Sequence, residues 1–488
     1  MYLGIDLGTS HAKVLLMDET GRIRATAGQP LAVSRPRALW SEQDPKHWWT
    51  AVERAMLILR QSHARELLAV RGIGLSGQMH GATLLDAQDR VLRPAILWND
   101  GRSERECEEL LLREPHLHEI AANLAMPGFT APKLLWLARH EPGLFRQTAS
   151  VLLPKDYLRL CMTGEKVSDM SDASGTLWLD VRARDWSDAL LNATGMTRRQ
   201  MPRLVEGSAP SGRLLPAVAQ AWGLSERIVV AGGGGDNAAS AVGIGAVRAG
   251  QGFISLGTSG VLFAVTDRLR PNPGAAVHAF CHALPERWHQ MAVMLSAASC
   301  LSWLAGTVGA CDVVGLLAEA AALTRAERER APLFLPYLSG ERTPHNDARA
   351  QGVFYGLGHE SSRGALAYAV LEGVAFGLAD GLAALGSAPA ELSLVGGGAR
   401  STLWAQLIAD ALDVPIVVHE GGDAGAALGA ARLGAMAAGL SEAAVCARPP
   451  VQRRFVPDPV CSDRLLARHR RYRELYARLQ SLFRHGLP

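Results

Sequence analysis

Two short turns that combine glycine with hydroxyl side chains occur about half a chain apart. Leu7-Gly8-Thr9-Ser10 recurs as Leu256-Gly257-Thr258-Ser259, and in each copy a β-type run precedes the turn and an apolar segment follows it. Glycine lets a backbone approach a ligand closely, and the N–H and hydroxyl groups of such turns bind phosphate oxygens. Ordinary hairpins would explain one turn, but the matched pair favours a polyphosphate site. Its predicted residues are Gly8, Thr9, Ser10, Lys13, Gly257, Thr258 and Ser259.

A run of four glycines, Gly232 to Gly235, leads from an apolar β-type segment into Asp236. The carboxyl end of a strand in an α/β sheet is a common ligand site. An aspartate at a helix start is either an N-cap or, if it faces a substrate, a general base. Four glycines leave room for a substrate, so the sequence favours a base at Asp236.

Polar side chains follow two other predicted strands in the first half of the chain, 70–75 and 95–98. Amide, imidazole and indole groups at strand ends can hydrogen-bond and stack on a sugar, although a single histidine is more often structural. Both interpretations stay open from the residues alone. The predicted substrate-binding residues are Gln78, Met79, His80, Trp98, Asn99 and Asn237.

Two weaker signals lie in the second half. Gly397 and Gly398 follow a strand and precede a helix, so they could lie under the flat base of a nucleotide, but close packing of helix on strand also explains them. A histidine- and cysteine-rich cluster matches no zinc spacing, and we interpret its residues as structural. That cluster is His278, Cys281, His282 and His289.

Composition excludes several classes of protein. The 488 residues carry a net charge of only +3, which gives no argument for a nucleic-acid or membrane partner. No uninterrupted apolar run approaches the roughly 18 residues of a membrane span, and the N-terminus lacks the pattern of a signal peptide. Seven cysteines without a CxxC pair favour free thiols and hence a cytoplasmic protein.

The predicted elements alternate between strands and helices, which indicates α/β domains. Helices are expected over 46–60, with Asp44 as N-cap and Pro45 at the first position, and over 401–412 and 424–438. A basic amphipathic helix over 463–484 is expected to dock on its own domain rather than bind a membrane or nucleic acid. The repeated turn predicts two related domains, residues 1–247 and 248–488.

Longer motifs resemble the FGGY family of carbohydrate kinases. Segment 128–137 looks like the first family signature, and 352–357 together with 371–373 looks like the second. Further segments resemble the bacterial members of the family that phosphorylate D-xylulose. These are 40–45, 77–81, 97–102, 153–157, 339–345 and 394–401.

This resemblance implies an α/β fold of two related actin-like (ribonuclease H-like) ATPase domains with a cleft between them. It implies transfer of the γ-phosphoryl group of ATP, with Mg²⁺, to the 5-hydroxyl of D-xylulose. Asp236 would be the catalytic base, Asp6 would support Mg²⁺ and phosphate, and Met79 and His80 would contact the sugar. Asp6 and Asp236 together are also the predicted metal site. Members of the family are often dimers, so a homodimer is also an expectation.

Three positions depart from the family pattern: His11 replaces a glycine, four glycines rather than three precede Asp236, and Ala365 replaces an acidic or amide residue. None removes a residue with an assigned catalytic role. Two alternatives remain: a kinase for another substrate such as ribulose or glycerol, and an actin-like nucleotide or sugar sensor without turnover. Segment 78–80 argues against the first, and the intact Asp6 and Asp236 argue against the second.

Overall fold

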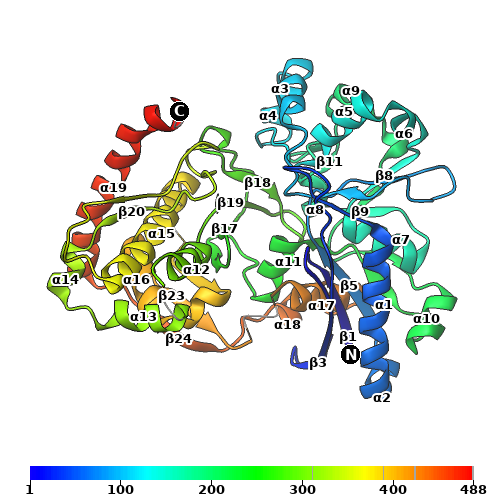
Figure 1. Ribbon diagram of the computed structural model, residues 1–488. Helices are drawn as coiled ribbons and strands as arrows, with labels where there is room; N and C mark the ends of the chain where they lie inside the picture. Colours follow the sequence, from blue (N-terminus) through cyan, green and yellow to red (C-terminus); the bar gives the residue numbers. More distant parts are fainter. Residues whose placement is uncertain (310–311, 388, 422–424, 486–488) are drawn as a thin grey trace.

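A computed structural model describes residues 1–309, 312–387, 389–421 and 425–485. The chain forms two mixed sheets with helices packed around them, in the two lobes of Figure 1. The strand order of the first sheet is β13-β14-β5-β1-β2-β3, with β15 also paired to β5. The order of the second is β18-β19-β17-β16-β22-β23-β24. The predicted α/β fold class is confirmed.

The first sheet contains β1 (Tyr2–Leu7), β2 (His11–Met17), β3 (Ile23–Pro30), β5 (Gly72–Gly77), β13 (Pro210–Arg213), β14 (Val229–Ala231) and β15 (Gly234–Gly235). The second contains β16 (Gln251–Leu256), β17 (Gly260–Thr266), β18 (His278–Cys281), β19 (Trp288–Met294), β22 (Glu391–Val395), β23 (Ile416–His419) and β24 (Val451–Phe455). Short pairs of strands lie outside these sheets: β4 (Glu42–Gln43) with β7 (Ala95–Ile96), β6 (Thr83–Leu85) with β8 (Ser150–Leu152), β9 (Val167–Asp169) with β12 (Arg203–Val205), β10 (Leu179–Asp180) with β11 (Asp185–Trp186), and β20 (Leu333–Leu335) with β21 (Val353–Tyr355).

The helices of the first half are α1 (Pro45–Ser62), α2 (Ala64–Leu68), α3 (Glu104–Arg113), α4 (Leu117–Ile120), α5 (Thr130–His140), α6 (Pro142–Gln147), α7 (Pro154–Thr163), α8 (Met170–Ser174), α9 (Asp188–Ala193), α10 (Pro216–Trp222) and α11 (Asp236–Gly243). Those of the second half are α12 (Ala298–Thr307), α13 (Val313–Ala322), α14 (Arg325–Arg330), α15 (Arg363–Leu385), α16 (Thr402–Leu412), α17 (Gly425–Ala437), α18 (Glu442–Val445) and α19 (Pro459–His485).

Each sheet is built around a hairpin and one parallel neighbour. In the first sheet β1 pairs antiparallel with β2 and parallel with β5. In the second, β16 pairs antiparallel with β17 and parallel with β22. The two Gly-Thr-Ser turns connect the strands of these two hairpins. The repeat seen in the sequence is therefore a repeat of the same three-stranded arrangement.

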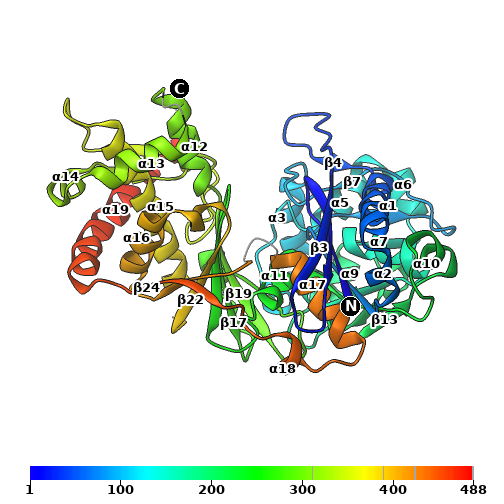
Figure 2. The same cartoon turned by 90° about the horizontal axis from the view of Figure 1, so that it is seen from below.

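A helix from the second half of the chain packs on the first sheet. Helix α17 lies against β1, β5 and α11, as Figures 1 and 2 show. The approach is close because glycines face backbone atoms: a Cβ at Gly429 would lie 1.7 Å from the Ala239 carbonyl oxygen, and one at Gly74 would lie 1.8 Å from that of Ala430. The helix that begins at Asp236 thus depends on a segment nearly 200 residues away, and strand β5 depends on one more than 350 residues away.

The expected helices are present. Helix α1 begins at Pro45 behind an Asp44 N-cap whose side chain accepts from the backbone N–H of Lys46, as predicted. The helix expected over 424–438 is α17; Ala424 lies outside the described residues.

The C-terminal helix α19 docks on its own half of the chain, as predicted. Leu465, Tyr472 and Tyr476 are buried in the core of that half, and Arg468 pairs with the buried carboxylate of Glu372 at 2.6 Å. Among the described residues one helix, α15, is long and apolar enough to cross a membrane, but 89% of its apolar window is buried inside the protein.

The glycine contact between α17 and α11 leads to a prediction. Gly429→Ala should lower the midpoint of thermal unfolding, with a loss of stability of about 3 kcal/mol, because the new methyl group meets a backbone carbonyl that cannot move alone. Gly425→Ala on the same helix is the control, since its Cβ would meet ordinary contacts at 3.5 Å and beyond. Equal midpoints for the two variants in calorimetry would contradict this account of the packing.

Candidate active site

Strand register brings two carboxylates to the same edge of the first sheet. Strand β5 is paired in parallel with β1 on one side, where Asp6 is opposite Ser76, and with β15 on the other, where Gly235 is opposite Gly77. Asp236 directly follows β15. Because the carboxyl ends of parallel strands meet at one edge of a sheet, the structure brings Asp6 and Asp236 together across the end of β5.

The environment of Asp236 suits a proton acceptor. The pKa of Asp236 is raised to about 6, mainly by burial and also by the nearby charge of Asp6, while the hydrogen bonds from Asn237 partly offset this effect. The carboxylate accepts from the backbone N–H of Asn237 at 2.7 Å and from its side-chain amide at 3.0 Å. Gly235 occupies the N-cap position of α11, and Asp236 is the first helical residue. The N-cap alternative considered for Asp236 is therefore wrong.

Asp6 faces a cation and carries an unsatisfied oxygen. Lys13 lies directly opposite Asp6 in the β1–β2 hairpin. Burial raises the pKa of Asp6, while the Ser76 hydroxyl and the charge of Lys13 partly offset this effect. Its Oδ1 atom is buried without a hydrogen-bond partner among the described residues. A carboxylate oxygen in this state is suited to a cation or to a water bound to one.

His80 follows β5 with a left-handed backbone, at φ 68°. Its carbonyl oxygen accepts from Lys133 Nζ at 2.8 Å and from the Thr130 hydroxyl at 3.1 Å, and these two bonds hold the unfavourable conformation. The ring Nδ1 lies 2.6 Å from the Gly175 carbonyl oxygen, so Nδ1 carries the proton and Nε2 is the acceptor. Burial lowers the pKa of His80 to about 3, so the ring is neutral.

Sequence reasoning missed the residues that hold His80 in place. Phe129 packs on the imidazole with ring centroids 4.5 Å apart, and Phe280 of the second sheet lies at 6.3 Å. Burial lowers the pKa of Lys133 to about 7. Phe129 and Lys133 lie in segment 128–137, which the family signature singled out, but no spacing rule connects either residue to His80.

One predicted contact does not fit the geometry. The Gln78 side chain is 2% exposed, its Oε1 accepts from the Thr9 hydroxyl at 3.0 Å, and its Nε2 donates to Gln43 at 2.9 Å. Gln78 therefore supports the first Gly-Thr-Ser turn from behind rather than facing a ligand. Trp98 remains 42% exposed and donates from Nε1 to the same Thr9 hydroxyl at 3.0 Å.

Two further predicted substrate-binding residues, Met79 and Asn99, follow strands β5 and β7. A Cβ at Gly235 would meet the sulfur of Met79 at 2.8 Å, so Met79 packs directly beneath the residue that precedes Asp236. Asn99 follows Trp98, and its Oδ1 is buried without a hydrogen-bond partner among the described residues. The structure therefore brings Met79 to Asp236 and leaves an amide oxygen of Asn99 unsatisfied.

The four glycines before Asp236 pack against the protein rather than leaving space for a ligand. A Cβ at Gly232 would lie 2.3 Å from the Glu206 carbonyl oxygen, and one at Gly233 would lie 2.4 Å from that of Leu75. All four are buried, and only Gly233 has a positive φ, at 82°. The expectation that the four glycines leave room for a substrate is wrong, because neighbouring backbone fills the space at Gly232 and Gly233, and the Met79 side chain fills it at Gly235.

The other two departures from the family pattern also have simple structural settings. His11 is the first residue of β2, and its carbonyl oxygen accepts from the backbone N–H of Gly8 at 2.9 Å. It lies outside the positive-φ region, so its conformation does not require glycine. Ala365 lies in the first turn of α15, where its N–H donates to the Ser362 N-cap.

The second Gly-Thr-Ser turn lies beside the glycine turn at 396–398. Ser255 and Val395 are partners in the parallel pairing of β16 with β22, so both turns occupy the same edge of the second sheet. A Cβ at Gly398 would lie 2.4 Å from the side chain of Leu256. Next to these turns is a cavity of about 450 Å³ with a mostly aliphatic wall. Its lining includes Leu301, Val313, Leu317, Gly397, Gly398 and Ser401.

The histidine- and cysteine-rich cluster is structural, as interpreted from the sequence. His278 stacks on Phe280 at 5.5 Å, and His289 stacks on Phe263 at 4.3 Å. Burial lowers the pKa of His289 well below its ordinary value, so its ring is neutral. In the described ranges no group of three or more His, Cys, Asp or Glu side chains could hold a metal ion.

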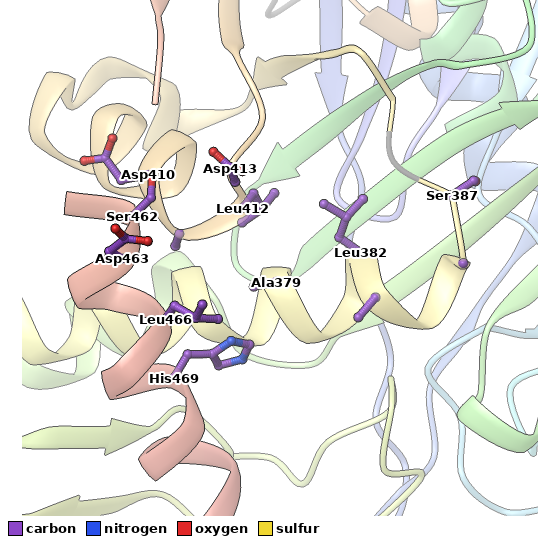
Figure 3. A pocket seen from close by; sticks show the side chains of 13 residues that line it. Ala379, Leu382, Ser387, Asp410, Leu412, Asp413, Ser462, Asp463, Leu466 and His469 are labelled. Carbon is purple, nitrogen blue, oxygen red and sulfur yellow. The ribbon is translucent and has the colours of Figure 1, made fainter. Parts of the chain in front are cut away.

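A separate cavity of about 520 Å³ lies where α15, α16 and α19 meet (Figure 3). None of the predicted site residues lines it. Two of its polar groups are occupied by the fold: Asp410 accepts from the Gln406 amide and from the backbone N–H of Asp458, and His469 pairs with Asp380 at 2.9 Å. This cavity results from the docking of the C-terminal helix.

Comparison with known proteins matches both halves of the chain. The model of the FGGY family of carbohydrate kinases, N-terminal domain, matches residues 1–243, and that of the C-terminal domain matches residues 252–438. The chain is 55% identical to the xylulose kinase of Escherichia coli (strain K12) over 99% of this chain and 100% of that protein. It is 52% identical to the xylulose kinase of Klebsiella pneumoniae over 99% of each.

Solved structures agree with this match. A crystal structure of a "xyloylose kinase" from Brucella ovis superposes with a TM-score of 0.95 at 53% identity, covering 99% of each chain. At that identity the likeness is one of sequence as well as fold. From its two matched domains and its full-length relatives, this chain belongs to the FGGY family of carbohydrate kinases.

Proposed function

We propose that this enzyme transfers the γ-phosphoryl group of ATP to the 5-hydroxyl of D-xylulose, giving D-xylulose 5-phosphate and ADP. The observation that carries the proposal is the 55% identity with the E. coli xylulose kinase along the entire chain. The paired carboxylates at the end of β5 and the neutral imidazole of His80 beside them support it.

In this proposal Asp236 is the catalytic base. A carboxylate whose pKa is about 6 is ionised at neutral pH and is a better base than an ordinary aspartate. It orients the sugar hydroxyl and accepts its proton as the new P–O bond forms, and the β–γ bridging oxygen of ATP leaves with the ADP. Phosphoryl transfer has a loose transition state, so positioning and charge neutralisation supply most of the acceleration.

The residues at the end of β1 fit a magnesium ion that arrives with ATP. Mg²⁺ keeps several waters and takes one or two carboxylates beside substrate phosphates. The unsatisfied Oδ1 of Asp6, close to Asp236, meets this need. Bound there, Mg²⁺ would neutralise charge on the phosphate oxygens. Lys13, opposite Asp6, adds a positive charge on the same side.

We assign sugar binding and the base to residues 1–247 and ATP binding to residues 248–488. On the sugar side His80 can accept a hydroxyl hydrogen at Nε2, and we assign Met79, Trp98, Asn99 and Asn237 to sugar binding as well. On the ATP side Gly397 and Gly398 line a cavity whose aliphatic wall suits a purine base. The Thr258 turn lies at the same edge of the second sheet. We place the enzyme in the cytoplasm, where ATP is available, and a homodimer stays a prediction.

Sugar-dependent turnover tests the assignment. Purified enzyme with MgATP should release ADP much faster with D-xylulose than without sugar, because only the sugar places a hydroxyl at Asp236. A coupled assay with D-xylulose, ribulose, glycerol and no sugar separates the alternatives. A clear preference for glycerol or ribulose would show that this compound, rather than D-xylulose, is the substrate. Equal rates in all four reactions would indicate a sensor rather than a kinase.

The role of Asp236 leads to a second prediction. Asp236→Asn should lower kcat by at least about two orders of magnitude, since the amide keeps the shape but cannot accept the proton. The melting temperature at pH 8 should be unchanged or higher, because the raised pKa means that the ionised carboxylate destabilises the fold above about pH 6. Asp188→Asn, at the first position of α9, is the matched control. Near wild-type kcat in Asp236→Asn would remove Asp236 from the mechanism.

The raised pKa also predicts a pH profile. The base must be ionised, so kcat/KM for the sugar should be flat above about pH 6 and fall about tenfold for each pH unit below it. Initial rates from pH 4.5 to 8.5 at saturating MgATP measure this acidic limb, the fall of kcat/KM below about pH 6. A profile that stays flat down to pH 5 would show that Asp236 titrates lower or is not the base. The residual activity of Asp236→Asn should lack this limb.

A further inference from the structure

A cluster of charged side chains lies beneath the proposed base, entirely inside the protein. Lys155 Nζ lies 2.6 Å from Asp156, 2.8 Å from Asp169 and 3.1 Å from Asp172, and Arg159 lies 3.4 Å from Asp156. All five side chains have an exposed fraction of zero. None of these side chains is exposed, so the cluster acts on the site through the protein around it.

The charges in this cluster compensate one another. Burial would lower the pKa of Lys155, but the three neighbouring carboxylates outweigh it and raise the pKa instead. Burial also raises the pKa of Asp172 well above its ordinary value, against the opposing charge of Lys155. Buried ion clusters add little net stability compared with apolar packing, and some instead define one geometry. The groups that contact this cluster show which part of the structure it holds in place.

Arg159 holds the amino-terminal end of the four-glycine segment Gly232 to Gly235, here called the base loop. Its guanidinium donates to the carbonyl oxygens of Ala231 and Gly232, each at 2.5 Å, and to the Ser211 hydroxyl. Its Nε donates to the carbonyl oxygen of Val167 at 3.1 Å. The end of β14 and the first glycine of the loop are thereby fixed to α7.

Ser171 holds the other end of the base loop. Its Oγ accepts from the backbone N–H of Gly235 at 3.1 Å and donates to Asp169 Oδ2 at 2.5 Å. Asp169 in turn pairs through Oδ1 with Lys155. A continuous chain of polar contacts thus runs from the buried ammonium group through Asp169 and Ser171 to the residue immediately before Asp236.

The base loop needs such external restraints because it has no side chains of its own to pack. Its other backbone contacts are the parallel pairing of Gly234 and Gly235 with β5 and the bonds from the Gly232 N–H to Ala209 and from the Gly233 N–H to Gly207. A displacement of about 1 Å at a reacting group can cost on the order of a hundredfold in rate. Restraint at both ends of the loop therefore bears directly on where the Asp236 carboxylate sits.

We propose that Arg159 and Ser171 are positioning residues, which use the buried charge cluster to fix both ends of the base loop and so aim Asp236 at the substrate hydroxyl. The inference rests on the proposed function, because it requires Asp236 to act in the reaction. It assigns the motif at 153–157 to the support of the base rather than to substrate contact. Neither residue touches the substrate, so their effect appears in the chemical step.

Ser171→Ala is the test, because it removes one hydroxyl and leaves the charges in place. It should lower kcat about tenfold while KM for D-xylulose and for ATP changes less than about twofold, since only the aim of the base is lost. Ser174→Ala on the same helix is the matched control: its hydroxyl bonds Met170 and Cys281 and does not touch the base loop. The control should keep kcat within about twofold of wild type. Thermal unfolding of both variants verifies that they fold.

A double-mutant cycle shows whether Ser171 acts through Asp236. In the Asp236→Asn background the effect of Ser171→Ala on kcat should shrink to less than about twofold, because there is no base left to aim. A tenfold effect that persists in that background would overturn the inference, as would wild-type kcat in Ser171→Ala alone. Near wild-type activity of Asp236→Asn itself would instead contradict the proposed function, so the two failures are distinguishable.

Discussion

Parallel pairing on both sides of β5 is the constraint on which the rest of this structure depends. Because β1 and β15 both pair with β5, Asp6, Asp236 and His80 meet at one sheet edge. A slip of one residue in the β1 pairing would turn Asp6 to the opposite face of the sheet. The site therefore depends on the register.

The packing around that sheet preserves this register. Helix α17 approaches β1, β5 and α11 so closely that side chains larger than hydrogen are excluded at several contacts. Such contacts leave little freedom for sliding, because backbone atoms on both sides are already at van der Waals distance. The second half of the chain thus stabilises the first, and the helix that begins at Asp236 is held along its length by α17.

The two sheets share a hairpin and a parallel neighbour but differ in the residues at the end of the neighbour strand. After β5 come Met79 and His80, which are buried or partly buried among aromatic rings. After β22 comes a glycine turn beside an aliphatic cavity. In the proposed function, one repeated framework presents a hydroxyl-binding surface on one side and a surface for a flat base on the other, with a Gly-Thr-Ser turn on each.

The sequence by itself determined the local features: the two hairpins, the helix behind Asp44, the strand ends that carry Asp6 and Asp236, and the family to which the chain belongs. These depend on residue type and spacing over short stretches, where backbone preferences act directly. Only the tertiary structure decided that Gln78 points inward, that close backbone packing requires glycine at Gly232 and Gly233, and that Ser171 and Arg159 reach the loop before Asp236. Those facts arise between segments that are distant in the sequence, more than 60 residues apart for Gln78 with Thr9, Ser171 with Gly235 and Arg159 with Gly232, where side-chain direction depends on register and packing that no local pattern encodes.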